Sequence, residues 1–460
     1  MKRFALGLLL GIAGASPAAR ADSDETARQL VESALKDDWG YRFLEGLTTE
    51  IGPRLAGTEA ETRAAGWAQE QLKAAGLQNV KAETFPMPGW VRGAETARVV
   101  WPAPQNLAVT TLGDSVPTSN DGIEAEVALY RSWAEFMAAP PGALQGKIAV
   151  VTQHMTRTMD ASGYSALYKM RGTGPSEAAR RGAVAYLLRS LGTDSARRPH
   201  TGSVDYVEGL PKIPAGALSN PDADQLERLA AKGTTVRLRL VLTPKPGKEV
   251  QSTTVSAEIP GSEHPEQIVL IGAHLDSWDL GTGAIDDGAG DAIVSGAARL
   301  IAALPQRPRR TIRVVLFGAE ERDFSGKAYA QAHREEVPHI MIASEADSGA
   351  RTAYAIRLPK GYQAGAFADR LASVLAPIRV FADPVAADDG GADFEELGKL
   401  GLPFVQVHQN DLDYFDYHHT ADDTFDKVDQ AELAQATAAW AAWVWLAADS
   451  DADFRSPANP

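Results

Sequence analysis

Residues 268–304 read IVLIGAHLDSWDLGTGAIDDGAGDAIVSGAARLIAAL and decide the fold of this 460-residue chain. The first part, residues 268–273, is a short and continuously apolar run, which is typical of a buried strand. A glycine-rich polar loop follows. From about residue 288 to residue 304 the pattern is that of a helix, closed by Pro305 and Pro308. A strand, a loop and a helix in this order indicate an α/β fold.

Three more apolar runs of strand length occur further along the chain. They lie at residues 312–317 (IRVVLF), 340–343 and 402–407. Strands separated by helices predict a mostly parallel, twisted sheet with helices on both faces. In such sheets, ligands collect beyond the carboxyl ends of the strands.

Histidine and acidic residues follow these runs, at the points where the predicted strands end. His274 comes directly after the first run, and the pair Glu320 and Glu321 follows the second. Asp347 follows the third. Divalent metals such as zinc take imidazole and carboxylate ligands. Because the strand ends meet at one edge of a parallel sheet, we expect these side chains to form a metal site.

Asp286 and Asp287 open the predicted helix and have two interpretations. Acidic residues at this position stabilise the helix dipole or cap the first turn. Alternatively, one carboxylate bridges two metal ions about 3.5–4 Å apart. The neighbouring glycines also suggest a phosphate-binding loop. The stretch lacks the G-K-[ST] ending and the G-x-G-x-x-G spacing, which argues against that use.

The chemistry of such a metal site also depends on three acids, Glu320, Glu321 and Asp276. Adjacent carboxylates at Glu320 and Glu321 repel each other unless a metal ion lies beside one of them. The other can then accept a proton from water. In a plain loop both would simply be solvated. Asp276, two positions after His274, can hydrogen-bond the ring nitrogen that faces away from a metal.

The last candidate ligand lies in YHHTADDT, residues 417–424. His418 and His419 compete there for the same role, and the residues alone leave both open. His200, in the segment PHTG, is a weaker candidate for contact with a substrate.

Composition and charge argue against several functions. The formal net charge is −15, and an acidic surface opposes binding to nucleic acid. The chain has no cysteine, so it offers no disulfide, no thiolate ligand and no thiol nucleophile. The Trp-rich run at residues 433–448 is shorter than a membrane span and predicts a buried helix. We expect neither a membrane nor a nucleic acid as partner.

The sequence predicts an export signal and a divided catalytic domain. Residues 1–21 contain a basic start, a short apolar run and an A-x-A cleavage site, which indicates a periplasmic or secreted bacterial protein. The first part of the catalytic domain is expected at residues 22–108. An insert follows at residues 109–248, and the second part, with the candidate ligands, at residues 249–460.

The predicted insert contains short apolar strands such as residues 147–151 and 184–188, between Gly, Pro and Ser residues. This pattern resembles the small βα module called a protease-associated domain. It carries no cluster of residues suited to catalysis, so we expect either a lid or a structural element.

The helix ahead of the insert has end signals. Thr58 and Glu61 have the spacing of a capping box, and Gly76 marks the stop. In a capping box, each of the two side chains accepts a hydrogen bond from the backbone amide of the other residue.

Together these motifs resemble the co-catalytic zinc aminopeptidase and glutamate carboxypeptidase family, and within it the plasma glutamate carboxypeptidase (carboxypeptidase Q) type. The resemblance spans nearly the whole chain after the leader, including the insert. The matching segments are IGPRLAGT (51–58), IPGSEHPEQIVLIGAHLDSWDLGTGAIDDGAG (259–290), RPRRTIRVVLFGAEE (307–321), EADSG (345–349), GGADF (390–394) and HHTADDT (418–424).

The resemblance implies a zinc exopeptidase fold with two zinc ions per chain. The implied ligands are His274 and Asp347 for one ion, Glu321 and His419 for the other, and Asp286 as a bridge between the ions. His419 is preferred to His418 because the family's ligand directly precedes Ser or Thr. The resemblance also implies a cis peptide bond after Asp286.

The implied function is exopeptidase hydrolysis of short peptides, dipeptides above all. A metal-bridging hydroxide would attack the scissile carbonyl, with Glu320 as general base and Asp276 orienting His274. The resemblance alone suggests a homodimer. Two alternatives are a glutaminyl cyclase-like transferase and a non-catalytic receptor-type relative. The intact ligand set disfavours both.

Overall fold

A five-stranded sheet at the centre of the larger lobe contains the stretch that decides the fold. The computed structural model describes residues 22–456, so the predicted export signal lies outside the described residues. The strands lie in the spatial order β1 (Gln78–Val91), β10 (Lys245–Ile259), β12 (Arg310–Phe317), β11 (His264–His274) and β13 (Ile340–Glu345). The apolar runs at residues 268–273, 312–317 and 340–343 are strands, as predicted.

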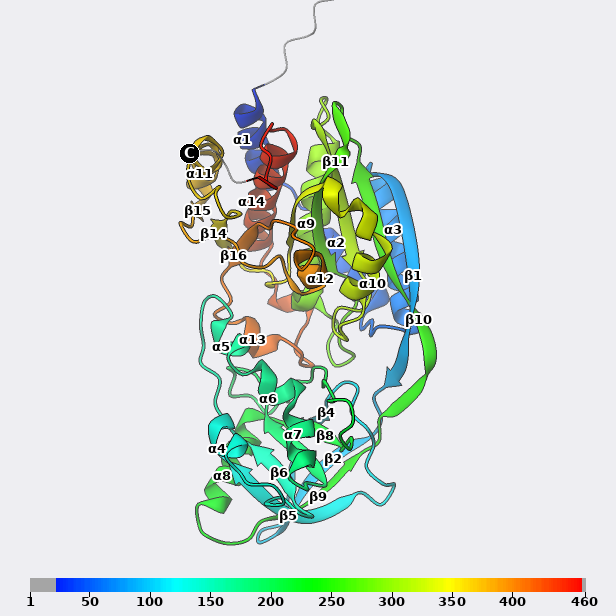
Figure 1. The fold of residues 1–460 in the computed structure, drawn as a ribbon, viewed down its shortest axis with the longest axis vertical. Helices are drawn as coiled ribbons and strands as arrows, with labels where there is room; N and C mark the ends of the chain where they lie inside the picture. The colour runs from blue at the N-terminus through cyan, green and yellow to red at the C-terminus, as the bar shows by residue number, and fades with distance from the viewer. Residues whose placement is uncertain (1–21, 457–460) are drawn as a thin grey trace, which may run out of the picture.

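This sheet is mixed, and the prediction of a mostly parallel sheet is wrong for one half of it. β11 is parallel to β12 and β13, whereas β10 is antiparallel to β1 and β12. The reason is the second lobe. β1 carries the chain away to that lobe and β10 brings it back, so the two strands run in opposite directions (Figure 1).

Helices cover both faces of the sheet, as predicted. In β11, Val269 and Ile271 face one core and Leu270 faces the other, as the two-residue period of a strand requires. The first core includes residues of α1 (Ser23–Ala34), α2 (Trp39–Gly46), α3 (Glu59–Ala74), α9 (Ala289–Ala302) and α14 (Gln430–Ala448). The second includes residues of α10 (Ser325–Ala332) and α12 (Glu395–Gly398).

The Trp-rich run forms α14, which is buried on all sides, as expected for a helix that is apolar all round. No helix within residues 22–456 combines the length and apolar character that a membrane span needs. A small sheet of β15 (Phe381–Ala382), β14 (Ala353–Arg357) and β16 (Gln406–Gln409), with α11 (Ala366–Leu375), packs beside α14.

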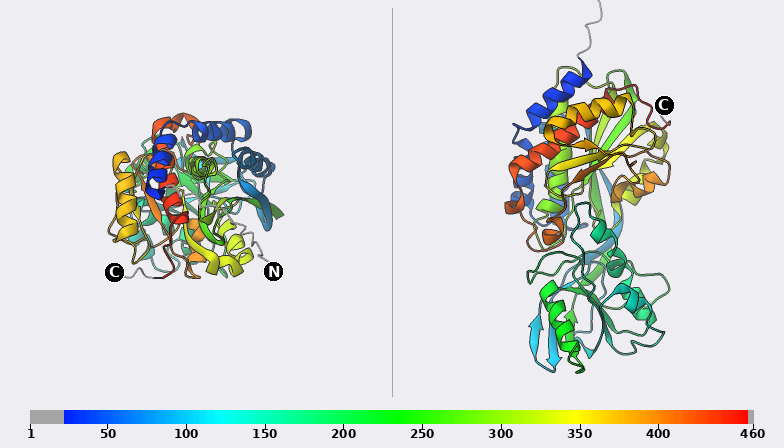
Figure 2. Two further views of the ribbon diagram at one scale, coloured as in Figure 1. Left: turned by 90° about the horizontal axis from the view of Figure 1, so that it is seen from above. Right: turned by 90° about the vertical axis from the view of Figure 1, so that its left-hand side faces the viewer.

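The second lobe is built on its own eight-stranded sheet (Figure 2). Its strands are, in spatial order, β3 (Gln105–Leu107), β2 (Glu95–Trp101), β9 (Arg237–Leu242), β5 (Ile123–Tyr130), β6 (Ile148–Val151), β7 (Ala185–Arg189), β8 (Ala215–Leu218) and β4 (Val109–Thr111). Short helices accompany it: α4 (Trp133–Met137), α5 (Ser162–Ser165), α6 (Tyr168–Gly172), α7 (Gly174–Arg180) and α8 (Asn220–Ala230). Its strands span residues 95–242, so two of them precede the start expected at residue 109.

The capping box at α3 forms only in part. Thr58 Oγ1 accepts the Glu61 amide at 3.4 Å, but the Glu61 side chain does not return to Thr58. Instead it is fully buried and accepts hydrogen bonds from the Thr253 amide at 2.8 Å and the Ser252 hydroxyl at 3.1 Å. Packing of α3 against β10 draws the Glu61 carboxylate inward.

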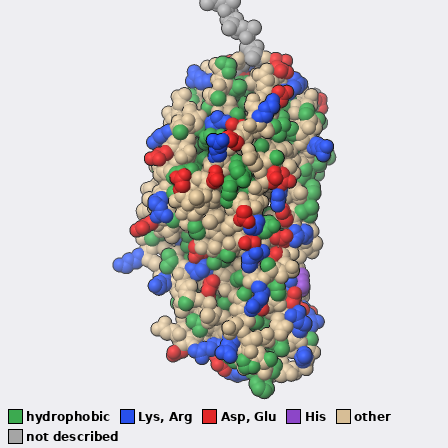
Figure 3. Space-filling model, turned by 180° about the vertical axis from the view of Figure 1, so that it is seen from behind, with side chains coloured by type: hydrophobic (Ala, Val, Ile, Leu, Met, Phe, Trp, Pro, Cys, Tyr) green, Lys and Arg blue, Asp and Glu red, His purple; other side chains and the backbone are tan. Residues whose placement is uncertain are grey.

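On the back of the molecule, acidic and basic side chains are interspersed on the surface (Figure 3).

Candidate metal centre

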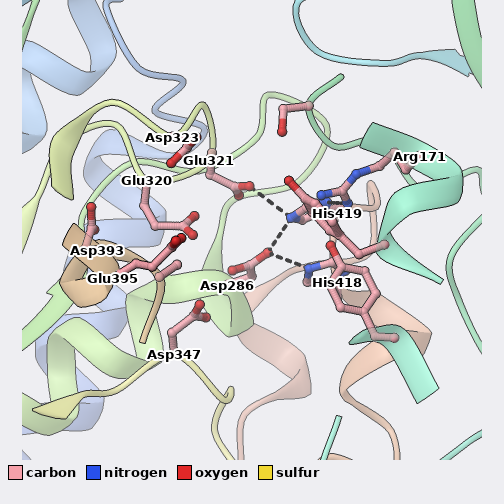
Figure 4. Close-up of a pocket in the computed structure, with 14 residues that line it drawn as sticks. Arg171, Asp286, Glu320, Glu321, Asp323, Asp347, Asp393, Glu395, His418 and His419 are labelled. Atoms are coloured by element: carbon pink, nitrogen blue, oxygen red, sulfur yellow. Dashed lines mark hydrogen bonds and ion pairs between the residues drawn. The ribbon is translucent and has the colours of Figure 1, made fainter. Parts of the chain in front are cut away.

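The five predicted ligands lie together at one edge of the central sheet, and all of them except His274 line a cavity of about 350 Å³ (Figure 4). His274 is the last residue of β11, and Glu321 and Asp347 follow β12 and β13. Asp286 lies in the turn Ala284–Gly288 ahead of α9. His419 follows α13 (Tyr414–Tyr417) and has a left-handed backbone conformation, with φ of 61°.

Asp286 contacts both histidines through different oxygens. Its Oδ1 lies 3.1 Å from His274 Nε2, and its Oδ2 lies 3.1 Å from His419 Nε2. The second histidine also approaches Glu321, with 2.9 Å between His419 Nε2 and Glu321 Oε2. Asp347 Oδ1 is 3.8 Å from His274 Nε2. The peptide bond between Asp286 and Asp287 is cis, as the resemblance implies.

Backbone carbonyls hold the outer nitrogen of each histidine. His274 Nδ1 lies 3.1 Å from the Asp276 carbonyl oxygen, and His419 Nδ1 lies 3.3 Å from the Thr201 carbonyl oxygen. A carbonyl oxygen only accepts hydrogen bonds, so each Nδ1 that faces one carries a proton. When the ring is neutral, the lone pair of its Nε2 points towards the carboxylates. A lone pair that faces a carboxylate needs a cation between the two, and a metal ion can be that cation.

Asp276 orients His274 mainly through its backbone, rather than through its carboxylate as predicted. The carboxylate Oδ1 lies 3.6 Å from His274 Nδ1, which is too far for a hydrogen bond. It instead accepts the Glu320 amide at 3.0 Å. One fully buried residue therefore fixes both His274 and the start of the Glu320–Glu321 pair.

The donor set fits divalent metal ions of the zinc type. Three groups of three residues each bring ligand atoms close together: Asp286, His418 and His419; His274, Asp287 and Asp347; and His274, Asp286 and Glu321. Asp286 Oδ2 is buried and makes no hydrogen bond. Imidazole nitrogens and carboxylate oxygens in such groups are zinc ligands.

The acids of the site are crowded, and their pKa values show it. Burial raises the pKa of Glu320 well above its usual value, and the charges of Asp347 and Glu321 add to this, while His274 opposes it. Burial also raises the pKa of Glu321 and of Asp347. Asp286 differs, because the neighbouring histidines outweigh burial and hold its pKa well below the usual range. These buried carboxylates have too little positive charge around them, and a bound cation would stabilise their ionised forms.

Glu320 lies beside the ligands and lines the cavity. Its Oε2 is 3.8 Å from His274 Nε2, and its side chain is 18% exposed. Glu320 therefore faces the space that a substrate would enter. A water molecule could contact both its carboxylate and the neighbouring ligands.

His418 lies against His419, with their ring centroids 3.5 Å apart. Its Nε2 is 3.6 Å from Asp286 Oδ2, and burial followed by the His419 charge holds its pKa well below the usual value. The structure brings both histidines to Asp286, and only His419 contacts Glu321. His200 lies behind them, with its Nδ1 2.7 Å from the His418 carbonyl oxygen and its Nε2 2.7 Å from Asp194.

Two residues that hold the metal loops were not singled out from the sequence. Arg54 is fully buried and donates to the carbonyls of Leu275, Thr282 and Gly283, which joins the His274 loop to the Asp286 turn. Asp423 accepts the amides of Ala284 at 2.8 Å, Ile285 at 2.6 Å and Asp286 at 3.2 Å. Both lie in motifs quoted above, IGPRLAGT and HHTADDT, and that position was the available signal.

A second pair of buried acids lies next to Glu320. Glu345 Oε2 accepts the Asp393 amide at 3.0 Å, and Asp393 Oδ1 accepts the Ser325 hydroxyl at 2.6 Å. Burial raises the pKa of Asp393 to about 7. The segments EADSG and GGADF thus meet at the acidic side of the cavity.

The second lobe closes the cavity from the other side. Tyr164, Tyr168, Arg171 and Ser203 line it together with the acids of the larger lobe. Figure 4 shows Arg171 beside His419, across the cavity from Glu320 and Asp393.

Comparison with known proteins gives consistent matches. The model of peptidase family M28 matches residues 254–444. Carboxypeptidase Q of Bos taurus is 36% identical over 84% of this chain and 80% of its own length. Carboxypeptidase Q of Mus musculus is 33% identical over 94% of this chain and 91% of its own length.

Two solved structures extend these matches. A peptidase M28 precursor from Shewanella amazonensis is 41% identical, with a TM-score of 0.91 over 95% of this chain and 99% of that one. A zinc aminopeptidase from Bacillus subtilis is 20% identical, with a TM-score of 0.65 over 91% of this chain and 96% of that one, which shows a shared fold.

Proposed function

This chain belongs to peptidase family M28 and is a metallo-exopeptidase, and we propose that it hydrolyses short peptides, dipeptides above all, with two zinc ions. The ligands in this proposal are His274 and Asp347 for one ion, Glu321 and His419 for the other, and Asp286 between the ions. The zinc aminopeptidase of Bacillus subtilis, which shares the fold, supports zinc as the metal.

The observation that carries the proposal is the position of Asp286. Each of its oxygens faces a different histidine at 3.1 Å, and each histidine has its outer nitrogen held by a backbone carbonyl. A carboxylate in this arrangement could hold two ions at once, one through each oxygen.

In this proposal the metal ions, when bound, supply Lewis acidity and lower the pKa of a water molecule. Glu320 accepts the proton of the attacking water at its carboxylate and passes it to the amine that leaves. The Asp276 carboxylate, which accepts the Glu320 amide, keeps Glu320 beside the ligands while the proton moves.

The size of the cavity favours short substrates. A volume of about 350 Å³ between two lobes suits a peptide of a few residues and excludes a folded protein. The carboxylates around Glu320 suit the ammonium group of a free amino terminus, which favours cleavage beside that terminus.

The test uses the chain without its leader, stripped with a chelator and reconstituted with zinc. We expect about two zinc ions per chain, no amino acid release from dipeptides without zinc, and restored release with it. Ammonia release from a peptide with N-terminal Gln, without dipeptide hydrolysis, would contradict the proposal in favour of a cyclase. Failure to bind zinc would contradict it altogether.

A further inference from the structure

The ligands of the two proposed metal ions differ in which lobe holds them. His274 and Asp347, the ligands of one ion, are held within the larger lobe. The Asp276 carbonyl oxygen lies 3.1 Å from His274 Nδ1. The Tyr414 hydroxyl donates to Asp347 Oδ1 at 3.4 Å. In the part of the chain that the structure describes, no residue of the second lobe forms a hydrogen bond or an ion pair with either of these ligands.

His419, a ligand of the other ion, is held by the second lobe. Thr201 of that lobe contacts it twice. The Thr201 carbonyl oxygen lies 3.3 Å from His419 Nδ1, and the Thr201 amide donates to the His419 carbonyl oxygen at 3.0 Å. These contacts fix the ring and also the backbone, whose φ of 61° is uncommon for a residue other than glycine. The position of this ligand therefore depends on the contact between the lobes.

Glu321, the second ligand of that ion, reaches the second lobe through Trp278. The Trp278 amide donates to Glu321 Oε1 at 3.3 Å, which leaves Oε2 to face His419. The Trp278 ring is buried and packs on the backbone of Gly113 in the second lobe. A Cβ at Gly113 would lie 1.9 Å from this ring, so the lobes meet there without space for a side chain.

Arg322, the residue after Glu321, binds the second lobe directly. Both carboxylate oxygens of Asp114 accept from its guanidinium, Oδ1 from Nη2 and Oδ2 from Nε, the latter at 3.3 Å. Only 3% of the surface of Arg322 is exposed. A bidentate pair of this kind holds two segments in one geometry, and loss of either partner leaves a charge poorly compensated. The pair therefore fixes the chain at Glu321 against the second lobe.

We propose that the second lobe completes the site of one metal ion, the ion that Glu321 and His419 hold, and that Arg322 is the positioning residue on the Glu321 side. Arg322 acts through its bond to Asp114, which keeps the neighbouring Glu321 carboxylate turned towards His419. The site of the other ion does not depend on this contact. This inference rests on the two-zinc site of the proposed function.

The experiment measures zinc binding by the chelator-stripped chain, in competition with a chromogenic chelator. In Arg322→Gln we expect the affinity for one ion to fall about 10- to 100-fold, while the affinity for the other is kept. Anomalous diffraction then identifies the weakened site. At a zinc concentration that fills both sites of the wild type, the peak beside Glu321 and His419 should be weak and the peak beside His274 should be full.

Asp114→Asn tests the same contact from the second lobe. Asp114 has a left-handed backbone, with φ of 62°. Asn has nearly the same shape and tolerates this conformation, so the substitution removes the charge without disturbing the loop. We expect the same loss at one site only. Because the two residues act as a pair, the double variant Arg322→Gln/Asp114→Asn should lose no more zinc affinity than Arg322→Gln alone.

Arg198→Gln is the matched control. Arg198 pairs with Asp422 and so also joins the second lobe to the larger lobe, but it does not adjoin Glu321. This variant should keep the zinc affinity of the wild type at both sites.

Three outcomes would overturn the inference. Equal losses at both sites in Arg322→Gln would show that the pair only stabilises the fold. Wild-type affinity at both sites in Asp114→Asn would show that the contact does not position Glu321. That result counts even if Arg322→Gln fails to fold, and it leaves the proposed function standing. A wild-type chain that binds no zinc overturns the proposed function and this inference together.

Discussion

The two lobes present opposite charges to the cavity that they share. The larger lobe lines it with seven carboxylates and two histidines, whereas the second lobe contributes two tyrosines, a serine and the cation of Arg171. Carboxylates and imidazoles can hold metal ions and move protons. A lone guanidinium can do neither, but it can bind an anion. We infer a division of labour in which the larger lobe performs the reaction and the second lobe closes the cavity around the substrate.

The largest effect should come from Glu320. If the larger lobe performs proton transfer, Glu320→Gln should lower kcat by about 1,000-fold, with unchanged zinc content. Steady-state kinetics and metal analysis of the same preparation check this. A kcat within 10-fold of the wild type would show that another group is the base.

The next prediction concerns Glu61, a buried acid of the larger lobe whose side chain does not line the cavity. Burial raises the pKa of Glu61 to about 7 from a usual value of 4.5, partly offset by the hydrogen bond from Thr253. The raised pKa disfavours the folded state once the carboxylate is ionised. The free energy of unfolding should therefore fall as the pH rises from about 4.5 to about 7 and stay level above that.

Glu61→Gln removes this charge and should stabilise the protein at pH 8 by about 3 kcal/mol, with little change at pH 4. Urea unfolding at the two pH values measures the difference. Glu59→Gln, at an exposed position of the same helix, is the control and should change little. Equal effects of Glu61→Gln at both pH values would show that the carboxylate is not an unfavourable charge in the folded state.

These residues also show what a sequence can and cannot predict. The strand–loop–helix stretch placed His274 and Asp286, because each adjoins an element whose periodicity is visible. Glu61 was interpreted as a local cap, yet its partners Ser252 and Thr253 are almost 200 residues away. Pro86 and Pro88 give the second half of β1 the composition of a loop, which hides the continuation of this strand towards the second lobe. Arg171 lines the cavity although no local pattern singled it out, since the cavity forms only where the two lobes meet.

A smaller effect is expected from Asp423, which holds the turn that presents Asp286. Asp423→Ala frees three backbone amides of that turn. We expect zinc affinity to fall about 10- to 100-fold, with kcat largely recovered at saturating zinc. Competition with a chromogenic chelator measures this. The neighbouring Asp422, paired with Arg198, provides the control Asp422→Ala, and equal losses in both variants would contradict the assigned role.

The smallest effect should come from His200. This prediction tests whether the second lobe contributes to metal binding. His200 belongs to the second lobe but supports the backbone of His418. We expect His200→Ala to lower zinc affinity by no more than about 10-fold and to leave kcat at saturating zinc unchanged. A fall in kcat at saturating zinc would show that His200 takes part in the reaction.

The central claim is that Asp286 lies between two metal ions. Anomalous diffraction at the zinc edge, from crystals of the zinc-loaded protein, tests it most directly. The account predicts two peaks about 3.5–4 Å apart, one on each side of Asp286. One of them should contact His274 and Asp347, and the other Glu321 and His419. A single peak, or two peaks of which only one contacts Asp286, would contradict the account.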